Sequence, residues 1–168
     1  DFYITLYFNL SKGYENAGLK RAYLDFNRTL KIRDGNKQRR DEQRRNSQEF
    51  LKNELLELIS SLLTSQNEFD QKHKTICFKL IENWNELSVG QAQKWINMTL
   101  KYWLLFGGKR IKNIERNAKY FHIPIDSKVQ KGMFTEKNPS AWSKIDQYEN
   151  YFAYQTIHRE KKTGNPPI

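Results

Sequence analysis

The sequence predicts an all-α protein, a compact bundle of about six or more helices in one domain spanning residues 1–168. Two observations lead to this expectation. From Asp41 onward, apolar residues recur with the three-to-four-residue period of amphipathic helices. The chain also holds 4 Trp, 9 Tyr and 10 Phe, and so many aromatic residues are typical of a folded core, although 29% of the residues are charged.

The first helices differ in how clearly they are marked. Residues 2–8 are β-prone by composition, but no partner strand is evident and a lone strand is unstable. We therefore expect this segment to be helical or extended against the core. The apolar patterns from Phe50 to Leu63 and from Phe69 to Trp84 then predict two amphipathic helices.

The next helix is predicted by its end signals. Ser88 is a suitable N-cap, and the helix is expected to run to about Phe106, where Gly107 and Gly108 end it. The apolar residues within 111–121 predict a fourth helix after these glycines.

Two more helices complete the predicted bundle. Asp126 or Ser127 is expected to cap a short helix that runs through Met133. Ser140 or Ser143 is expected to open the last helix, which carries aromatic and aliphatic residues as far as Ile157.

The net charge points to the class of partner. A formal charge of +10 favours a polyanion, nucleic acid before an anionic membrane surface, although solubility alone is the alternative. No apolar run is long enough for a transmembrane helix, and no signal peptide is visible. We therefore expect a cytoplasmic, nucleoid-associated monomer without membrane contact.

The composition also excludes several kinds of site. Cys77 is the only cysteine, which rules out a disulfide framework, a cysteine-rich zinc site and a four-cysteine iron–sulfur cluster within one chain. His73, His122 and His158 share no metal-ligand spacing. We expect neither a metal nor a cofactor.

The segment 88–108 carries the first candidate for chemistry. Its predicted helix is apolar nearly all round, which is typical of a buried helix, yet one face carries Lys94 and Lys101. Buried lysine is uncommon unless paired, and burial disfavours the charged ammonium. A neutral amine is a nucleophile that can form a Schiff base. The alternative is that both lysines extend along the helix flank to solvent.

The segment 121–129 carries the second candidate. Its apolar residues and Pro124 lead to Asp126 at the start of a predicted helix. Backbone N–H groups and the helix dipole stabilise a carboxylate at such a position. Asp126 is either a plain N-cap or a partner for a cation from the preceding buried helix.

Together these two segments resemble the helix-hairpin-helix DNA glycosylases. Those enzymes carry a catalytic lysine after a glycine-containing hairpin, and a catalytic aspartate in a Pro-x-Asp sequence that opens a helix. Here Lys94 follows Val89-Gly90, and Asp126 ends the sequence Pro124-Ile125-Asp126. The long spacing between Lys94 and Asp126 is similar to that of the archaeal-type 8-oxoguanine DNA glycosylases, the AGOG branch. The usual Leu-Pro-Gly-Val-Gly-x-Lys hairpin is absent.

The resemblance implies a base-excision repair enzyme that acts on damaged double-stranded DNA. In that case Lys94 would be the Schiff-base nucleophile, Asp126 would act as acid and base, and AP lyase activity would accompany the glycosylase. Lys101, two turns after Lys94, would line the base pocket, and 8-oxoguanine would be the substrate. Asp146 on the last helix would accept from purine N–H groups.

Such an enzyme must extrude a nucleotide and hold the phosphates beside it. Trp95, Trp142 and Phe134 are candidates for stacking on a base, although core packing is the alternative for each. Backbone N–H groups near Gly90 and Gln91, or at Gly107-Gly108, are candidates for phosphate at a helix start. Basic residues cluster in 31–45 and again in 101–119. The predicted phosphate contacts in the second cluster are Lys109, Arg110, Lys112 and Arg116.

Two functions of other classes compete with this hypothesis. A non-catalytic nucleic-acid-binding module would use the same basic clusters, with Lys94 and Asp126 as a structural ion pair. A protein-interaction domain would present Trp142, Tyr148 and Tyr151 with Phe152 as one exposed patch.

Overall fold

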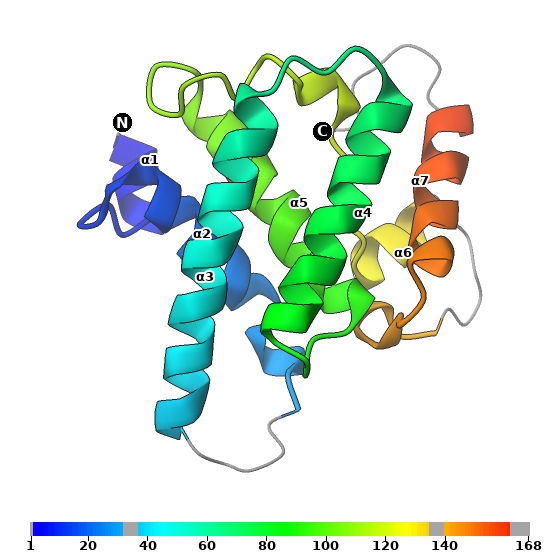
Figure 1. The fold of residues 1–168 in the computed structure, drawn as a ribbon, viewed down its shortest axis with the longest axis horizontal. Coiled ribbons are helices and arrows are strands. Elements are labelled where there is room, and N and C mark those ends of the chain that lie inside the picture. Colours follow the sequence, from blue (N-terminus) through cyan, green and yellow to red (C-terminus); the bar gives the residue numbers. More distant parts are fainter. Residues whose placement is uncertain (1, 32–36, 135–139, 162–168) are drawn as a thin grey trace.

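The computed structural model describes residues 2–31, 37–134 and 140–161, and these ranges contain helices and no strand (Figure 1). The all-α prediction is therefore confirmed for this part of the chain. The α-helices are α1 (Phe2–Tyr7), α2 (Gly13–Phe26), α3 (Lys37–Ser60), α4 (Gln66–Asn83), α5 (Val89–Phe106), α6 (Ser127–Met133) and α7 (Tyr148–Lys161). Three short 3₁₀ turns are η1 (Asn27–Thr29), η2 (Ala118–Tyr120) and η3 (Trp142–Lys144).

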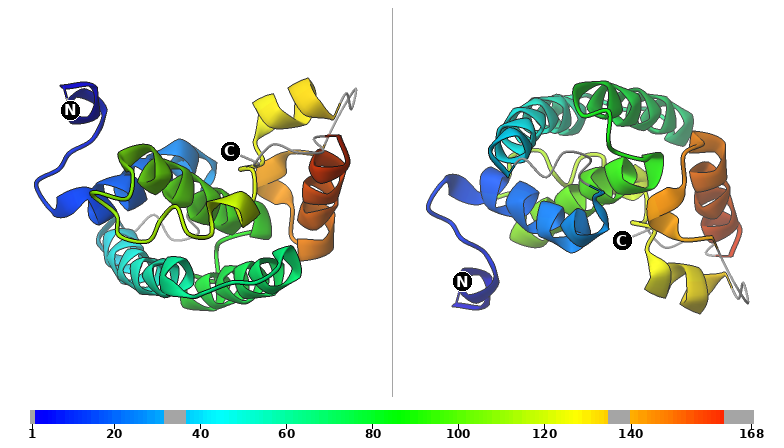
Figure 2. Two further views of the ribbon diagram at one scale, coloured as in Figure 1. Left: turned by 90° about the horizontal axis from the view of Figure 1, so that it is seen from above. Right: turned by 90° about the horizontal axis from the view of Figure 1, so that it is seen from below.

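Helix α5 is the centre of the fold. Figures 1 and 2 show it behind the layer formed by α3 and α4, with α2 beside it. Its ends follow the sequence signals: Ser88 and Gln91 form a capping box, and Gly107 ends the helix at a φ of 79°. Every residue from Val89 to Leu100 is buried. A helix surrounded in this way can hold a polar side chain away from water.

Helix α2 packs closely against α5 through tryptophan side chains. The indole N–H of Trp95 donates to the carbonyl of Leu19 at 3.1 Å, and that of Trp103 donates to the carbonyl of Glu15 at 3.0 Å. A Cβ atom at Gly18 would lie only 2.6 Å from the Trp103 ring. The glycine therefore allows the two helices to approach closely enough for both hydrogen bonds.

Helices α3 and α4 form one side of the bundle. The buried apolar residues of α3 fall in its second half, and Leu51, Leu55 and Leu58 have the spacing of one helix face. Ser65 caps α4 by accepting from the backbone N–H of Glu68. The polar first half of α3 thus extends past the core, and this extension matters for the charged groove described below.

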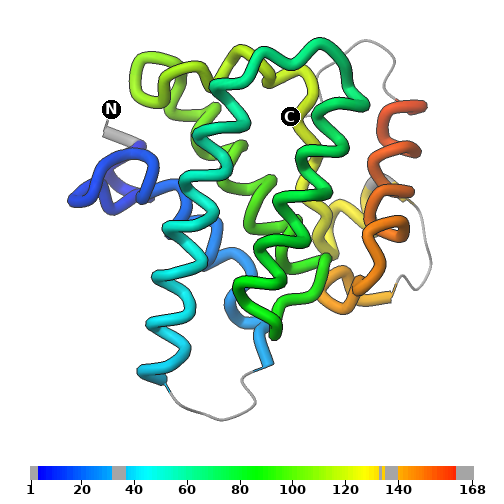
Figure 3. Tube along the Cα trace, viewed as in Figure 1, coloured from blue at the N-terminus to red at the C-terminus, as the bar shows by residue number. Residues whose placement is uncertain are grey.

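The prediction of a fourth helix within residues 111–121 is wrong. Residues 111–121 form turns that end in η2, as the trace in Figure 3 shows, although Ile111, Ile114 and Phe121 are buried as the pattern implied. Asn113 has a φ of 68°, a left-handed conformation that interrupts a helix. The apolar spacing therefore reflects burial of a loop rather than helical geometry.

The ends of the chain also differ in detail from the prediction. The N-terminal segment forms α1, the helical one of the two expected alternatives. The last helix begins at Tyr148, not at Ser140 or Ser143, because residues 142–144 form η3 and Ile145 is extended. The extended Ile145 presents its carbonyl to the N–H of Gly90 at 2.9 Å. Asp126, and not Ser127, caps α6.

The contact between the start of α5 and η3 gives a stability prediction. A Cβ atom at Gly90 would lie 1.8 Å from the backbone carbonyl oxygen of Trp142, and neither backbone can move without breaking the Gly90–Ile145 hydrogen bond. Gly90→Ala is expected to lower the free energy of unfolding by about 3 kcal/mol or more. Urea denaturation followed by circular dichroism measures this change.

Gly132→Ala in α6 is the matched control, because nothing lies within 4 Å of a Cβ atom there. It is expected to be neutral or to stabilise by up to about 1 kcal/mol, since alanine is the better helix former. Equal effects of the two substitutions would contradict the close approach at Gly90.

Candidate functional site

Lys94 and Asp126 lie in direct contact. The Nζ atom of Lys94 is 2.7 Å from Oδ2 of Asp126. The lysine side chain is 5% exposed and the aspartate side chain 29%. Lys94 projects from the buried part of α5, and Asp126 stands at the N-terminus of α6. The amine is thus shielded from water while its carboxylate partner can still be approached from solvent.

The two oxygens of Asp126 have separate partners. Oδ1 accepts from the backbone N–H groups of Lys128 at 3.0 Å and Val129 at 2.9 Å, which makes the N-cap of α6, while Oδ2 accepts from Lys94. Burial on its own raises the pKa of Asp126, but the hydrogen bonds from Lys94 and the two N–H groups outweigh burial and lower it. The group is therefore a carboxylate near neutral pH, oriented toward the amine.

The extended segment before Asp126 is held by two glutamine side chains. Gln93 donates from Nε2 to the carbonyl of Ile125 at 2.9 Å and accepts from its N–H at 3.2 Å. Gln155 makes the same pair with Ile123, at 2.8 and 3.0 Å. Pro124 lies between them and has no N–H to satisfy. The backbone that carries Asp126 is thereby fixed from α5 on one side and from α7 on the other.

A buried polar network continues from Gln93. Asn97 donates from Nδ2 to Gln93 Oε1 at 3.0 Å and to the Tyr151 hydroxyl at 2.8 Å. The Tyr151 hydroxyl contacts Nδ1 of His122 at 2.7 Å, and Oδ1 of Asn97 contacts Nε2 of His73 at 3.0 Å. The network therefore joins α4, α5, α7 and the segment before Asp126.

An ion pair closes the far end of this network. Asp70 contacts Nε2 of His122 at 2.8 Å and accepts two hydrogen bonds from Arg159, each at 2.8 Å. Burial raises the pKa of Asp70, but the hydrogen bonds from His122, Arg159 and Gln66 outweigh it and lower it far below its ordinary range. Asp70 is thus a permanent acceptor at neutral pH.

One arrangement of protons satisfies both histidines in their neutral form. His122 donates from Nε2 to Asp70 and accepts at Nδ1 from Tyr151, while His73 donates from Nε2 to Asn97 and accepts at Nδ1 from Tyr148, 2.8 Å away. Burial lowers the pKa of His122 and lowers that of His73 well below its ordinary value. Neither ring carries a charge in the folded protein at neutral pH.

The structure separates the two lysines that the sequence placed on one helix face. Lys94 is buried, whereas Lys101, two turns further along α5, is exposed. Lys101 therefore lacks the shielded environment of Lys94, and its contact with an extruded base stays a prediction. Only Lys94 has the shielded environment that the nucleophile hypothesis requires.

Trp95 is a core residue, so its predicted role in stacking on a base is wrong. Its ring is fully buried, packs against Tyr23 and Phe26, and is anchored by the hydrogen bond to Leu19. Trp142 is half-buried in η3. Phe134 is buried at the end of α6, where its ring packs against Tyr154 with centroids 4.8 Å apart.

The predicted phosphate contacts of Gly90 and Gln91 are also wrong. The N–H of Gly90 donates to Ile145, and that of Gln91 donates to the Ser88 hydroxyl at 3.1 Å, so both are occupied within the protein. Gly107 and Gly108 follow the C-terminus of α5 rather than open a helix, and the N–H of Gly108 donates to Glu115. The dipole at that end disfavours an anion.

The basic residues after α5 are of two kinds. Lys109 and Lys112 are exposed. Arg110 donates to the carbonyl of Phe106 and lies over a tyrosine ring, and Arg116 donates to the carbonyl of Ser60. Arg116 is exposed like the two lysines, and Arg110 is half-buried, so three of the four charges are accessible while both arginines also serve the fold.

Asp146 is exposed at the start of the C-terminal region. It lines a groove of about 620 Å³ together with Lys144, Asn150 and Tyr154. The aromatic patch that the protein-interaction hypothesis requires is not present, because Tyr148 and Tyr151 are buried in the polar network. The network explains their burial, since each hydroxyl has a histidine partner.

Sequence reasoning missed most of the residues that position Asp126. Gln93 and Asn97 are one helical turn apart on a helix that is otherwise apolar, and such polar residues in a buried helix were the available signal. Gln155 and Asp70 gave no signal, since polar residues on α4 and α7 are more often exposed.

Within the described ranges no cluster of three or more His, Cys, Asp or Glu could hold a metal ion, and Cys77 is buried. Among the same residues, no helix is long and apolar enough to cross a membrane. Comparisons of the chain with protein-family models, with curated proteins and with solved structures found no match.

The neutral histidines give a pH-dependence prediction. Because the pKa values of His73 and His122 are lowered in the folded protein, the unfolded chain takes up protons below about pH 6.5 while the folded chain does not. The free energy of unfolding is expected to be level above pH 7. It should fall below pH 6.5 by up to about 2.7 kcal/mol per pH unit for two groups.

Urea denaturation at a series of pH values measures this dependence. The His73→Gln variant is the control, because it removes one titrating group and should reduce the slope between pH 6.5 and 5 by about half. Below about pH 4, the Asp70 carboxyl takes up a proton in the unfolded chain but not in the folded protein, because its folded pKa is lowered. This lowers the free energy of unfolding further. Stability that stays level or rises between pH 7 and 5 would show that the buried histidines do not stay neutral.

Proposed function

We propose that this protein is a DNA base-excision N-glycosylase with associated AP lyase activity, in which Lys94 is the nucleophile and Asp126 the proton acceptor. The observation that carries the proposal is the 2.7 Å contact between Lys94 Nζ and Asp126 Oδ2, with the lysine side chain 5% exposed. A shielded amine beside an oriented carboxylate is the minimum that Schiff-base chemistry on a sugar needs.

The first step joins the enzyme to the sugar. The ammonium of Lys94 passes a proton to Asp126 Oδ2, and the amine lone pair then attacks C1′ of an extruded nucleotide. The bond from C1′ to the base breaks, and its electron pair leaves with the base, which takes up a proton. Asp126 gives its proton to the departing base and so returns to the carboxylate, which stabilises the positive charge that develops on the sugar.

The second step breaks the strand. The sugar ring opens as the bond from C1′ to O4′ breaks and O4′ takes up a proton, which leaves an imine between Lys94 and C1′. Loss of a proton from C2′ then expels the 3′ phosphate by β-elimination. Asp126 is suited to move these protons because Oδ1 is held by the N-cap of α6, which leaves Oδ2 directed at the amine.

A helix-hairpin-helix core is proposed from the resemblance of the sequence, and one local feature is compatible with it. Helices α4 and α5 are joined by the short connection 84–88, and Lys94 lies in the second turn of α5. Lys101, Trp142 and Asp146 remain proposed contacts to the extruded base. 8-Oxoguanine remains the proposed lesion, which rests on the resemblance of the sequence. Lys109, Arg110, Lys112 and Arg116 remain the proposed phosphate contacts of this region.

A second candidate is a non-catalytic nucleic-acid-binding module. It is favoured by the partners that the pair has within the protein. Lys94 Nζ donates to Asp126 Oδ2, and Asp126 Oδ1 accepts from the two backbone N–H groups of the α6 cap. A buried ion pair of this kind contributes little net stability but is costly to break. Both candidates bind DNA, so only covalent chemistry separates them.

Borohydride trapping on a duplex with one abasic site tests the proposal without knowledge of the lesion. Wild type is expected to form a reduced covalent adduct, and Lys94→Gln is expected to form none. Asp126→Asn keeps the N-cap of α6, since asparagine caps as well as aspartate, and is expected to slow trapping by roughly 100-fold or more.

Lys128→Gln is the matched control, because Lys128 is exposed two residues after Asp126 and should trap at the wild-type rate. An adduct that persists in Lys94→Gln, or its absence in folded wild type, would overturn the enzyme assignment in favour of the binding module.

A further inference from the structure

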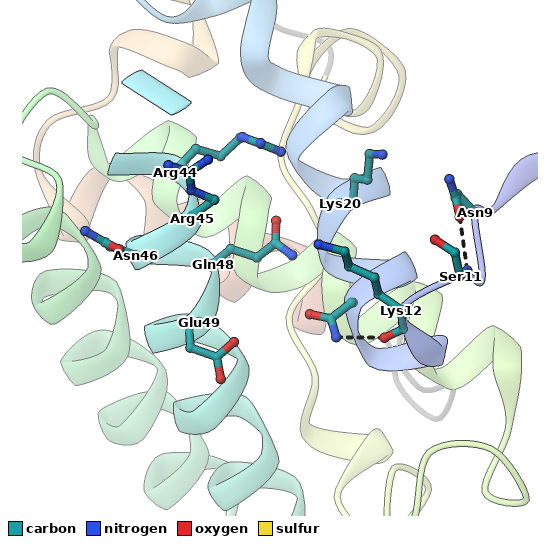
Figure 4. A pocket seen from close by; sticks show the side chains of 10 residues that line it. Asn9, Ser11, Lys12, Lys20, Arg44, Arg45, Asn46, Gln48 and Glu49 are labelled. Atoms are coloured by element: carbon teal, nitrogen blue, oxygen red, sulfur yellow. Dashed lines mark hydrogen bonds between the residues drawn. The ribbon is translucent and has the colours of Figure 1, made fainter. Parts of the chain in front are cut away.

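A second charged feature lies away from Lys94, between the start of α2 and the outer half of α3. Here a groove of about 620 Å³ is lined entirely by polar and charged residues (Figure 4). The lining residues are Asn9, Ser11, Lys12, Asn16, Lys20, Arg44, Arg45, Asn46, Gln48 and Glu49. Figure 4 shows Lys12 and Lys20 on one side and Arg44, Arg45 and Gln48 of α3 on the other. Two segments distant in sequence thus supply one wall each.

The cations in this groove are largely unneutralised. Lys12, Lys20 and Arg45 are exposed, and within the described ranges none of them has a carboxylate at ion-pair distance. Arg44 is less free, since its Nε lies 3.9 Å from Asp41 and its guanidinium lies over the Tyr23 ring. Glu49, the only carboxylate in the lining, pairs with Lys52 at 2.7 Å. The groove therefore presents a concentrated positive field.

The lining also excludes some ligands. It contains no aromatic or large aliphatic side chain, so it offers no face on which an unpaired base could stack and no apolar surface for a lipid chain or a hydrophobic peptide. Lysine, arginine, serine, asparagine and glutamine are the side chains that contact phosphate and sugar oxygens in nucleic-acid complexes. The chemistry fits a phosphodiester backbone rather than bases.

The backbone that carries one wall is ordered by its own hydrogen bonds. The N–H of Ser11 donates to Oδ1 of Asn9 at 3.0 Å, and the amide of Asn16 donates to the carbonyl of Lys12 at 2.8 Å (Figure 4). These bonds fix the turn that leads into α2, so the backbone of Lys12 at the edge of the groove is held in place. A preorganised backbone loses less conformational entropy when a ligand binds.

We propose that this groove binds the phosphate backbone of duplex DNA, without reading its sequence, as a second contact surface separate from the Lys94–Asp126 site. The choice of duplex DNA rests on the proposed function and deepens it, since a base-excision enzyme must hold the helix on which it searches. The groove itself does not depend on the chemistry of Lys94.

Binding of a short undamaged duplex, measured by fluorescence anisotropy at several salt concentrations, tests this proposal. The triple variant Lys12→Gln, Lys20→Gln, Arg45→Gln removes three exposed side chains that have no packing role, and Lys12 makes no side-chain cap for α2. It is expected to weaken binding by roughly tenfold or more at low salt and to reduce the salt slope of log K by about 2 to 3.

The control removes the same charge from α4, by Lys72→Gln, Lys74→Gln and Lys79→Gln, and should leave the salt slope nearly unchanged. Equal losses in both variants would mean that only net charge matters, and no loss in the groove variant would mean that the groove is not used. Either result overturns the proposal. It is also overturned if the protein binds single-stranded DNA more tightly than duplex and only the groove variant weakens that binding.

The test is independent of the proposed chemistry, because an undamaged duplex cannot be trapped. If trapping fails while the groove variant loses binding, the groove stands and the glycosylase does not. If trapping succeeds and the groove variant binds normally, the reverse holds.

Discussion

The contact between Lys94 and Asp126 is the constraint around which the molecule is built. An ammonium can be held away from water only beside a carboxylate, and a carboxylate is held there only if its second oxygen is also satisfied. Asp126 meets both needs, because Oδ2 accepts from Lys94 and Oδ1 caps α6. The contact therefore depends on the burial of α5 from Val89 to Leu100 and on the start of α6 at Ser127.

The remaining buried polar groups serve that arrangement. Gln93 and Gln155 hold the backbone of Ile125 and Ile123, and the network that starts at Gln93 ends at the ion pair of Asp70 and Arg159. Because α4, α5 and α7 each contribute to this network, a shift of one helix would leave several buried groups unpaired. The position of Asp126 is thus fixed by hydrogen bonds in three helices, and by apolar packing around α5.

The sequence predicted the helices whose ends carry local signals, and with them the positions of Lys94 and Asp126. Ser88 and Asp126 are caps, Gly107 ends α5, and both Lys94 and Asp126 follow from these boundaries. The failures have a common cause, because apolar spacing reports burial and not conformation. Residues 111–121 are buried in turns, and Trp95 is in the core. The partners of Gln155 and the lysines of the charged groove depend on tertiary contacts that no local pattern encodes.

Peptide mapping of the reduced covalent complex identifies the attacking nitrogen and so decides whether Lys94 is the nucleophile. Wild-type protein is incubated with an abasic duplex and borohydride, digested, and analysed by mass spectrometry. A deoxyribose-derived mass is expected on the peptide that contains Lys94, and on no other lysine at comparable yield. An adduct on a different lysine, or on the α-amino group, would contradict it and would leave Lys94 and Asp126 as a structural ion pair.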